Sequence, residues 1–90
     1  MNISLDIDLT YLQDSMEFLR NYPSCNKNVS QVVDVILSAN CDLDLRMVLN
    51  RLVNHYGGAR WSAIAKLAQA MNAGAVTIDC SGSFRVVCCG

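Results

Sequence analysis

Hydrophobic and polar residues alternate at the start of the chain, over residues 2–9 (NISLDIDL). The apolar positions are Ile3, Leu5, Ile7 and Leu9, and the polar positions between them are Ser4, Asp6 and Asp8. A period of two is expected where a strand buries one of its faces. We therefore predict a β-strand over residues 2–9.

The next two segments have the spacing of helices. Thr10 can cap a helix that stops before Pro23, because proline cannot continue a helix. A second helix is predicted to start at Asn28, with Gln31 as the reciprocal partner in a capping box. Residues 32–37 (VVDVIL) are rich enough in β-branched side chains that a strand remains open there.

Two further helices are bounded by local signals. Asp42 or Asp44 can cap a helix over residues 45–56, which Gly57 ends. A last helix is predicted over residues 60–73. Its spacing gives an inward face of Trp61, Ile64, Leu67, Ala68 and Met71, and an outward face of Ser62, Ala63, Lys66, Gln69 and Ala70.

Residues 75–89 (AVTIDCSGSFRVVCC) are predicted to form a β-hairpin. An odd-length loop over residues 81–83 puts the apolar side chains on one face and Arg85 opposite Asp79. The expected cross-strand pairs are Cys80 with Phe84, Ile78 with Val86, and Val76 with Cys88. Together with the N-terminal strand, this predicts an α+β fold, in which a three-stranded antiparallel sheet is covered on one face by about four helices.

Length and composition predict a single domain over residues 1–90. With 52% hydrophobic and 17% charged residues, the chain has the balance of a folded domain. The first 16 residues contain no Lys or Arg, and no window approaches the run of about 18 apolar residues that a membrane span needs. We therefore expect a cytoplasmic protein that is neither exported nor inserted into a membrane.

The five cysteines of the chain form no C-x-x-C pair: they are Cys25, Cys41, Cys80, Cys88 and Cys89. Their odd number and their spacing argue against a disulfide framework and against a zinc site. We expect reduced and mostly buried thiols.

Charge is divided unevenly along the chain, whose net charge is −1. Residues 1–45 hold seven acidic and two basic side chains, whereas residues 46–90 hold five basic and one acidic. If the two halves separate in space, one face of the protein is mildly basic.

Residues 54–71 (NHYGGARWSAIAKLAQAM) join two predicted helices through a glycine turn, which raises the question of a DNA-binding helix-turn-helix. Gly58 suits the turn, and the hairpin that follows could serve as a wing. However, Asn54 and Gly57 stand where an alanine and an apolar residue are usual. The order of elements resembles the end of a winged helix-turn-helix, but a plain pair of helices with a glycine cap is favoured.

Residues that could support catalysis or metal binding have simpler interpretations. His55, the one histidine, lies where a helix C-terminus favours a protonated ring, and no nucleophile motif accompanies it. Asp6 and Asp8 could share a strand face, and residues 42–45 (DLDL) lack the glycine and glutamate of a calcium loop. We expect no catalytic residue, no cofactor and no metal.

By elimination, we expect a non-enzymatic protein-interaction module, alone or as a homodimer. It would act as a small inhibitor or regulator that binds a larger protein assembly, of the kind that phages and other mobile elements often encode. The predicted partner-binding residues are Arg60, Ser62, Lys66, Gln69 and Arg85. Trp61 is expected in the core, although a Trp beside Arg60 also has the composition of an interface hot spot.

The alternative is a small transcriptional regulator related in arrangement to winged helix-turn-helix proteins. It would bind duplex DNA through Arg60, Lys66, Gln69 and Arg85. Two cations near the groove would neutralise few phosphates, and phosphate contacts supply most non-specific affinity. We therefore rank this function second.

Overall fold

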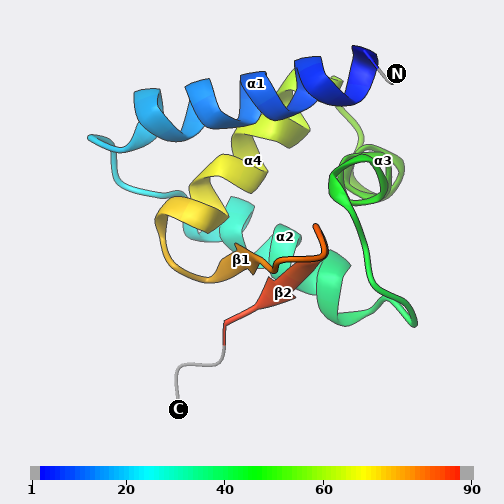
Figure 1. Ribbon diagram of the computed structural model, residues 1–90. Helices are drawn as coiled ribbons and strands as arrows, with labels where there is room; N and C mark the ends of the chain where they lie inside the picture. Colours follow the sequence, from blue (N-terminus) through cyan, green and yellow to red (C-terminus); the bar gives the residue numbers. More distant parts are fainter. Residues whose placement is uncertain (1–2, 88–90) are drawn as a thin grey trace.

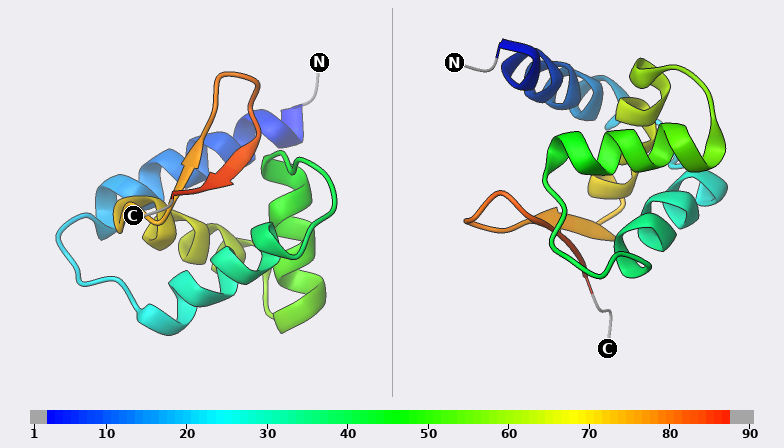
Figure 2. Two further views of the ribbon diagram at one scale, coloured as in Figure 1. Left: turned by 90° about the horizontal axis from the view of Figure 1, so that it is seen from below. Right: turned by 90° about the vertical axis from the view of Figure 1, so that its right-hand side faces the viewer.

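Four helices and a β-hairpin make up the structure. The computed structural model describes residues 3–87, and the side chains of residues 7–87. The elements are α1 (Ile3–Leu19), α2 (Asn26–Leu37), α3 (Leu45–Tyr56), α4 (Arg60–Asn72), β1 (Val76–Ile78) and β2 (Phe84–Val86). The central helix is α4, which contacts α1, α2 and α3 (Figure 1). Both views in Figure 2 place α4 between α1 and α2.

The N-terminal segment is helical, so the predicted strand over residues 2–9 is wrong. Four positions of α1 point inward at the three- and four-residue spacing of a helix: Asp8, Leu12, Met16 and Leu19. The alternating pattern was misleading because a carboxylate, Asp8, occupies an inward position, while the apolar Ile7 and Leu9 are exposed.

Within the described residues the sheet has two strands, β1 and β2, which pair antiparallel. The fold is α+β, as predicted, but the predicted three-stranded sheet is wrong because its first strand is part of α1. A loop takes the place beside β2 instead. The backbone N–H of Phe84 donates to the carbonyl of Leu43 at 2.8 Å, which holds the α2–α3 loop against the hairpin.

The second predicted helix is confirmed as α2, so the strand left open there is excluded. Val32 and Val35 are buried at helical spacing. The predicted capping box is wrong, because α2 begins earlier, with Cys25 as its N-cap. The side-chain amide of Asn28 instead donates to the Gln69 side chain at 3.4 Å, and Gln31 plays no part in a cap.

The third helix follows the local signals in the sequence closely. The carboxylate of Asp44 accepts a hydrogen bond from the backbone N–H of Met47 at 3.0 Å, which caps the start of α3. At the other end Gly57 adopts a φ of +74°, a conformation that L side chains rarely adopt. Of the two capping residues that the sequence suggests, the N-cap of α3 is therefore Asp44 and not Asp42.

The orientation of α4 differs in part from the prediction. Ile64, Leu67 and Ala68 are buried as expected, but Ala63 and Ala70, predicted to face outward, are buried as well. Trp61, predicted to face the core, is 74% exposed. Small alanine side chains on several sides let neighbouring helices approach α4 closely, so Ile64 and Leu67 are enough to fill its inward face without Trp61.

The hairpin has the predicted odd-length loop, but its register is shifted by two residues. The observed pairs are Val76 with Val86, Thr77 with Arg85, and Ile78 with Phe84. The loop spans residues 80–82, and its third position, Gly82, has a φ of +87°. A three-residue hairpin loop needs a left-handed residue at that position, which selects the register that places glycine there.

An ion pair with a buried carboxylate joins α1 to the start of α4. Asp8 is 5% exposed, and both of its carboxylate oxygens accept hydrogen bonds from the guanidinium of Arg60. At the opposite end of α4, the side-chain amide of Asn72 donates to the backbone carbonyl of Met16 at 2.8 Å. These two contacts fix the direction and register of α1 on α4.

We predict that Asp8→Asn lowers the free energy of unfolding by about 2–3 kcal/mol, because it leaves Arg60 without its counter-charge. The loss should fall below that of a fully buried pair, since the Arg60 side chain is 41% exposed. Urea denaturation followed by circular dichroism measures it. Glu17→Gln on the exposed side of α1 is the matched control and should change stability by less than about 0.5 kcal/mol. Equal effects of the two changes would contradict the role given to the pair.

Candidate interaction surface

The five residues predicted to bind a partner do not form one surface. Ser62, Lys66 and Gln69 follow one another at four- and three-residue spacing, so they share a side of α4. Arg60 lies on the opposite side of the same helix, where it contacts Asp8 of α1. Arg85 belongs to β2.

Arg60 is largely engaged within the protein. Its Nε and Nη2 donate to Asp8, and its Nη1 donates to the side-chain oxygen of Asn50 at 3.2 Å. The hydrogen bond to Asp8 raises the pKa of Arg60 above its ordinary value. Because all three guanidinium nitrogens donate to side chains of α1 and α3, few donors of Arg60 remain for a partner.

Three residues on the other side of α4 are half-buried, and two of them have internal partners. The ammonium of Lys66 lies 5.4 Å from the centre of the Tyr56 ring, a cation–π contact with the end of α3. The Gln69 side-chain oxygen accepts from the backbone N–H of Cys25 at 3.0 Å, so it satisfies a donor at the start of α2. Ser62 lies in the first turn of α4.

Arg85 is held by two acidic residues. Its guanidinium lies 3.0 Å from a carboxylate oxygen of Asp79 in the hairpin and 3.1 Å from one of Asp42 in the α2–α3 loop. Asp79 also accepts from the hydroxyl of Ser81 at 2.6 Å and from the backbone N–H of Ser83 at 3.1 Å. The Ser81 hydroxyl and then Arg85 hold the pKa of Asp79 well below its ordinary value of 3.8.

These contacts predict an acid-sensitive hairpin. Because the pKa of Asp79 is lowered in the folded state, its contribution to stability is full at neutral pH and declines as the pH falls below about 4. The amide shifts of Ser81 and Ser83, followed by NMR from pH 6 to pH 1.5, should titrate with a midpoint below 3.8. Asp79→Asn should abolish this titration. A midpoint at the ordinary carboxyl value would contradict the turn geometry.

Aromatic side chains are the unexpected feature of the surface. Of the six aromatic residues in the chain, only Phe84 is buried. Four of the exposed ones belong to α1, the turn that follows it, and the start of α4; we call them the aromatic face: Tyr11, Phe18, Tyr22 and Trp61. The rings of Phe18 and Tyr22 are in contact, with centroids 5.6 Å apart.

A groove runs through the aromatic face where α1 meets α4. It has a volume of about 330 Å³ and is lined by Tyr11, Asp14, Ser15, Phe18, Leu19 and Ala65. Trp61 precedes Ala65 by one turn on the same side of α4, at the end of α4 that the Asp8–Arg60 pair holds against α1. The groove therefore lies between exposed rings of α1 and the side of α4 that carries Trp61 one turn earlier.

The prediction from sequence missed this surface for two reasons. Helical spacing assigns Trp61 to the core, and the alternating pattern divides α1 into a strand and a helix. Along a single helix over residues 3–19, the positions Ile7, Tyr11, Asp14 and Phe18 form a second stripe at four- and three-residue spacing. This stripe lies beside the inward one that carries Leu12.

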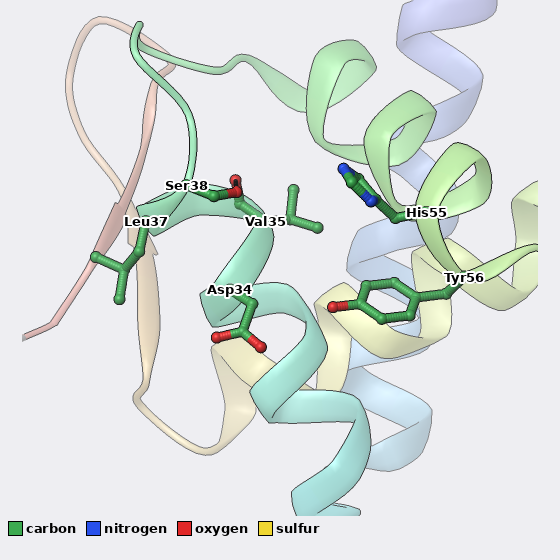
Figure 3. A pocket seen from close by; sticks show the side chains of 6 residues that line it. All are labelled: Asp34, Val35, Leu37, Ser38, His55 and Tyr56. Carbon is green, nitrogen blue, oxygen red and sulfur yellow. Dashed lines mark hydrogen bonds between the residues drawn. The ribbon is translucent and has the colours of Figure 1, made fainter.

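A second hollow, of about 340 Å³, lies between the last turns of α2 and α3 (Figure 3). The rings of His55 and Tyr56 point from α3 toward α2, where Asp34 and Ser38 lie (Figure 3). In the part of the chain that is described, no hydrogen bond joins the His55 side chain to Asp34 or Ser38. The arrangement does not assemble a relay of acid, base and nucleophile.

The thiols are placed differently from the prediction. Cys25, Cys41 and Cys80 are free and exposed, so the expectation of mostly buried cysteines is wrong for them. Cys88 and Cys89 lie outside the described residues. The exposed thiols occur in a cap, a loop and a hairpin turn, positions where packing does not demand burial.

The chain matches no protein-family model, no curated protein and no solved structure. Between residues 3 and 87, none of the helices combines the length and hydropathy needed to cross a bilayer. The aromatic face is the feature of the described surface that most needs explanation, because large exposed apolar patches on monomers usually mark binding sites.

Proposed function

We propose that the protein is a non-enzymatic interaction module that binds a protein partner through the aromatic face. The observation that carries this proposal is the exposure of five of six aromatic residues, four of them on α1, the turn that follows it and the start of α4, around a core in which Phe84 is the one aromatic side chain. Aromatic residues are enriched at the centre of protein interfaces and among the residues that dominate binding. A small cytoplasmic inhibitor or regulator of a larger assembly is the role that fits such a module.

The size of the aromatic face suits a specific contact. Four aromatic side chains of about 150–250 Å² each, exposed by 57–74%, offer on the order of 500 Å² of surface. With an equal area from the partner, about 1,000 Å² would be buried, which is the lower end for a specific interface. A modest and reversible complex follows from this area.

The charge in the groove favours a protein over a nucleic acid. Asp14 lines the groove and forms no ion pair within the described residues. A carboxylate in this position would repel the phosphates of a duplex. It would attract a protein segment that combines apolar and basic side chains.

Phe18→Ser and Trp61→Ser should each remove the bound partner without unfolding the protein. Both side chains are mostly exposed in the free protein, so each change should alter the free energy of unfolding by less than about 0.5 kcal/mol. Partner capture from lysates of the cells that encode the protein, quantified by mass spectrometry, measures the loss. At least a tenfold decrease is expected, as for the truncation of an interface anchor.

Leu37→Ser is the matched control for this experiment. Leu37 is 67% exposed, close to the 68% of Phe18, but it lies at the end of α2, outside the aromatic face. A protein that binds only because apolar surface is exposed should be lost equally from Leu37→Ser and from Phe18→Ser. A partner retained by Phe18→Ser and Trp61→Ser would remove the aromatic face as the binding site.

The DNA-binding alternative receives less support from the geometry. A recognition helix must expose one side to the major groove, whereas α4 is packed by α1, α2 and α3. Of the proposed contacts, Arg60 and Arg85 are paired with carboxylates, and Gln69 accepts hydrogen bonds from the start of α2. Freeing them would break contacts between elements of the fold.

We therefore expect no saturable binding to a 20-base-pair duplex at low salt, measured by fluorescence anisotropy at protein concentrations up to about 10 μM. Non-specific DNA binders reach dissociation constants of roughly 1–100 μM even at physiological salt, so this range at low salt is a sensitive one. Binding that weakens steeply with salt, and that Lys66→Glu combined with Arg85→Glu abolishes, would instead establish the DNA-binding function.

A further inference from the structure

We infer that the groove in the aromatic face is a slot for an arginine side chain of the partner, held between the rings of Tyr11 and Phe18 and paired with Asp14. This inference rests on the proposed function and specifies the chemistry of the partner. It commits the site to a protein segment that presents an arginine together with apolar residues. The same surface could otherwise take a purely apolar helix or a second copy of this chain.

The spacing along α1 provides room for one planar cation. Tyr11 and Phe18 are seven residues apart, which corresponds to about 10.5 Å along a helix axis and brings them to nearly the same side. A guanidinium stacked between two rings needs about 3.5–4 Å on each side, or roughly 7–8 Å in total. The groove of about 330 Å³ extends between these residues, and the short side chain of Ala65 lies at its edge on α4.

Asp14 supplies a negative charge in the lining of the groove, between Tyr11 and Phe18 along α1. Within the described residues its carboxylate has no hydrogen bond or ion pair, so both oxygens are available to an incoming donor. A planar guanidinium can donate to both oxygens at once, whereas an ammonium acts as a point charge. The half-buried Ser15 beside it offers a hydroxyl oxygen as a further acceptor.

The protein uses both components of this slot internally. Less than two turns earlier on α1, Asp8 accepts two hydrogen bonds from the guanidinium of Arg60. On another surface, the ammonium of Lys66 lies over the ring of Tyr56. The groove combines a carboxylate, that of Asp14, with two aromatic rings, those of Tyr11 and Phe18. The described part of the protein places no cation there.

The slot can be tested with a minimal probe, N-acetyl-arginine amide, titrated into the intact, isotope-labelled protein and followed by NMR. Binding in the millimolar range is expected, with shift changes centred on residues 11–19 and on Ala65. N-acetyl-citrulline amide, which has nearly the same shape but no charge, should bind at least tenfold more weakly. The lysine analogue should also bind more weakly, because it lacks the planar fork.

Two variants separate the slot from general electrostatic attraction. Asp14→Asn should weaken arginine binding by at least tenfold while leaving the rest of the spectrum unchanged. Glu17→Gln removes the same charge from an exposed position three residues further along α1 and should leave binding within about twofold of the original protein. Equal losses from both variants, equal binding of citrulline, or shift changes outside the groove would each overturn the slot.

The outcomes also distinguish this inference from the proposed function. If arginine does not bind but Phe18→Ser still loses its protein partner, the interaction module stands and the slot is wrong. If arginine binds at Asp14 but the partner is retained by Phe18→Ser and Trp61→Ser, the groove binds a guanidinium but is not the site of the partner, so the proposed function is wrong and the slot does not hold an arginine of that partner. NMR shift changes in the aromatic face that depend on protein concentration in the absence of any ligand would show that a second copy of the chain binds there. That result would overturn the inference of a bound arginine.

Discussion

The fold depends on the contact between α1 and α4, and within it on the ion pair of Asp8 and Arg60. Asp8 is the one polar or charged residue that is fully buried among those described, and its partner lies 52 positions away in the sequence. A buried carboxylate is tolerable only when a counter-charge and hydrogen bonds replace its water. The pair therefore specifies how α1 lies on the central helix, because any other register would leave the Asp8 carboxylate buried without a counter-charge.

The same contact explains why the aromatic residues are outside. The central helix packs its neighbours against alanines and aliphatic side chains, and the one buried ring, Phe84, belongs to the hairpin. On α1, the inward stripe that includes Asp8 and Leu12 points to α4, so the adjacent stripe with Tyr11 and Phe18 emerges beside the groove. The inward stripe and the stripe with Tyr11 and Phe18 belong to the same helix. A change in how α1 packs on α4 would therefore also turn Tyr11 and Phe18 away from the groove.

Much of the fold could be predicted from sequence wherever the decisive signals were local. Asp44 caps α3 and Gly57 ends it by contacts within a few residues, and the odd length of the hairpin loop follows from the alternation of its strands. The N-terminal segment could not be predicted this way. An inward Asp8 makes sense only beside Arg60, and without that pairing its neighbours follow the period of a strand. The exposed position of Trp61 was hidden for a related reason, since periodicity alone assigns a large apolar residue to the core.

The division of charge along the chain also acquires a different meaning in three dimensions. The acidic first half and basic second half do not form two faces, because Asp8 pairs with Arg60 and Asp42 pairs with Arg85 across the boundary between them. These ion pairs neutralise Arg60 and Arg85, two of the cations that the sequence suggests for a basic surface. In the groove of the aromatic face they leave Asp14 unpaired among the described residues. A groove that combines exposed rings with a free carboxylate selects basic and apolar protein segments and disfavours phosphate backbones, so the internal ion pairs help to determine which class of partner the outer surface can bind.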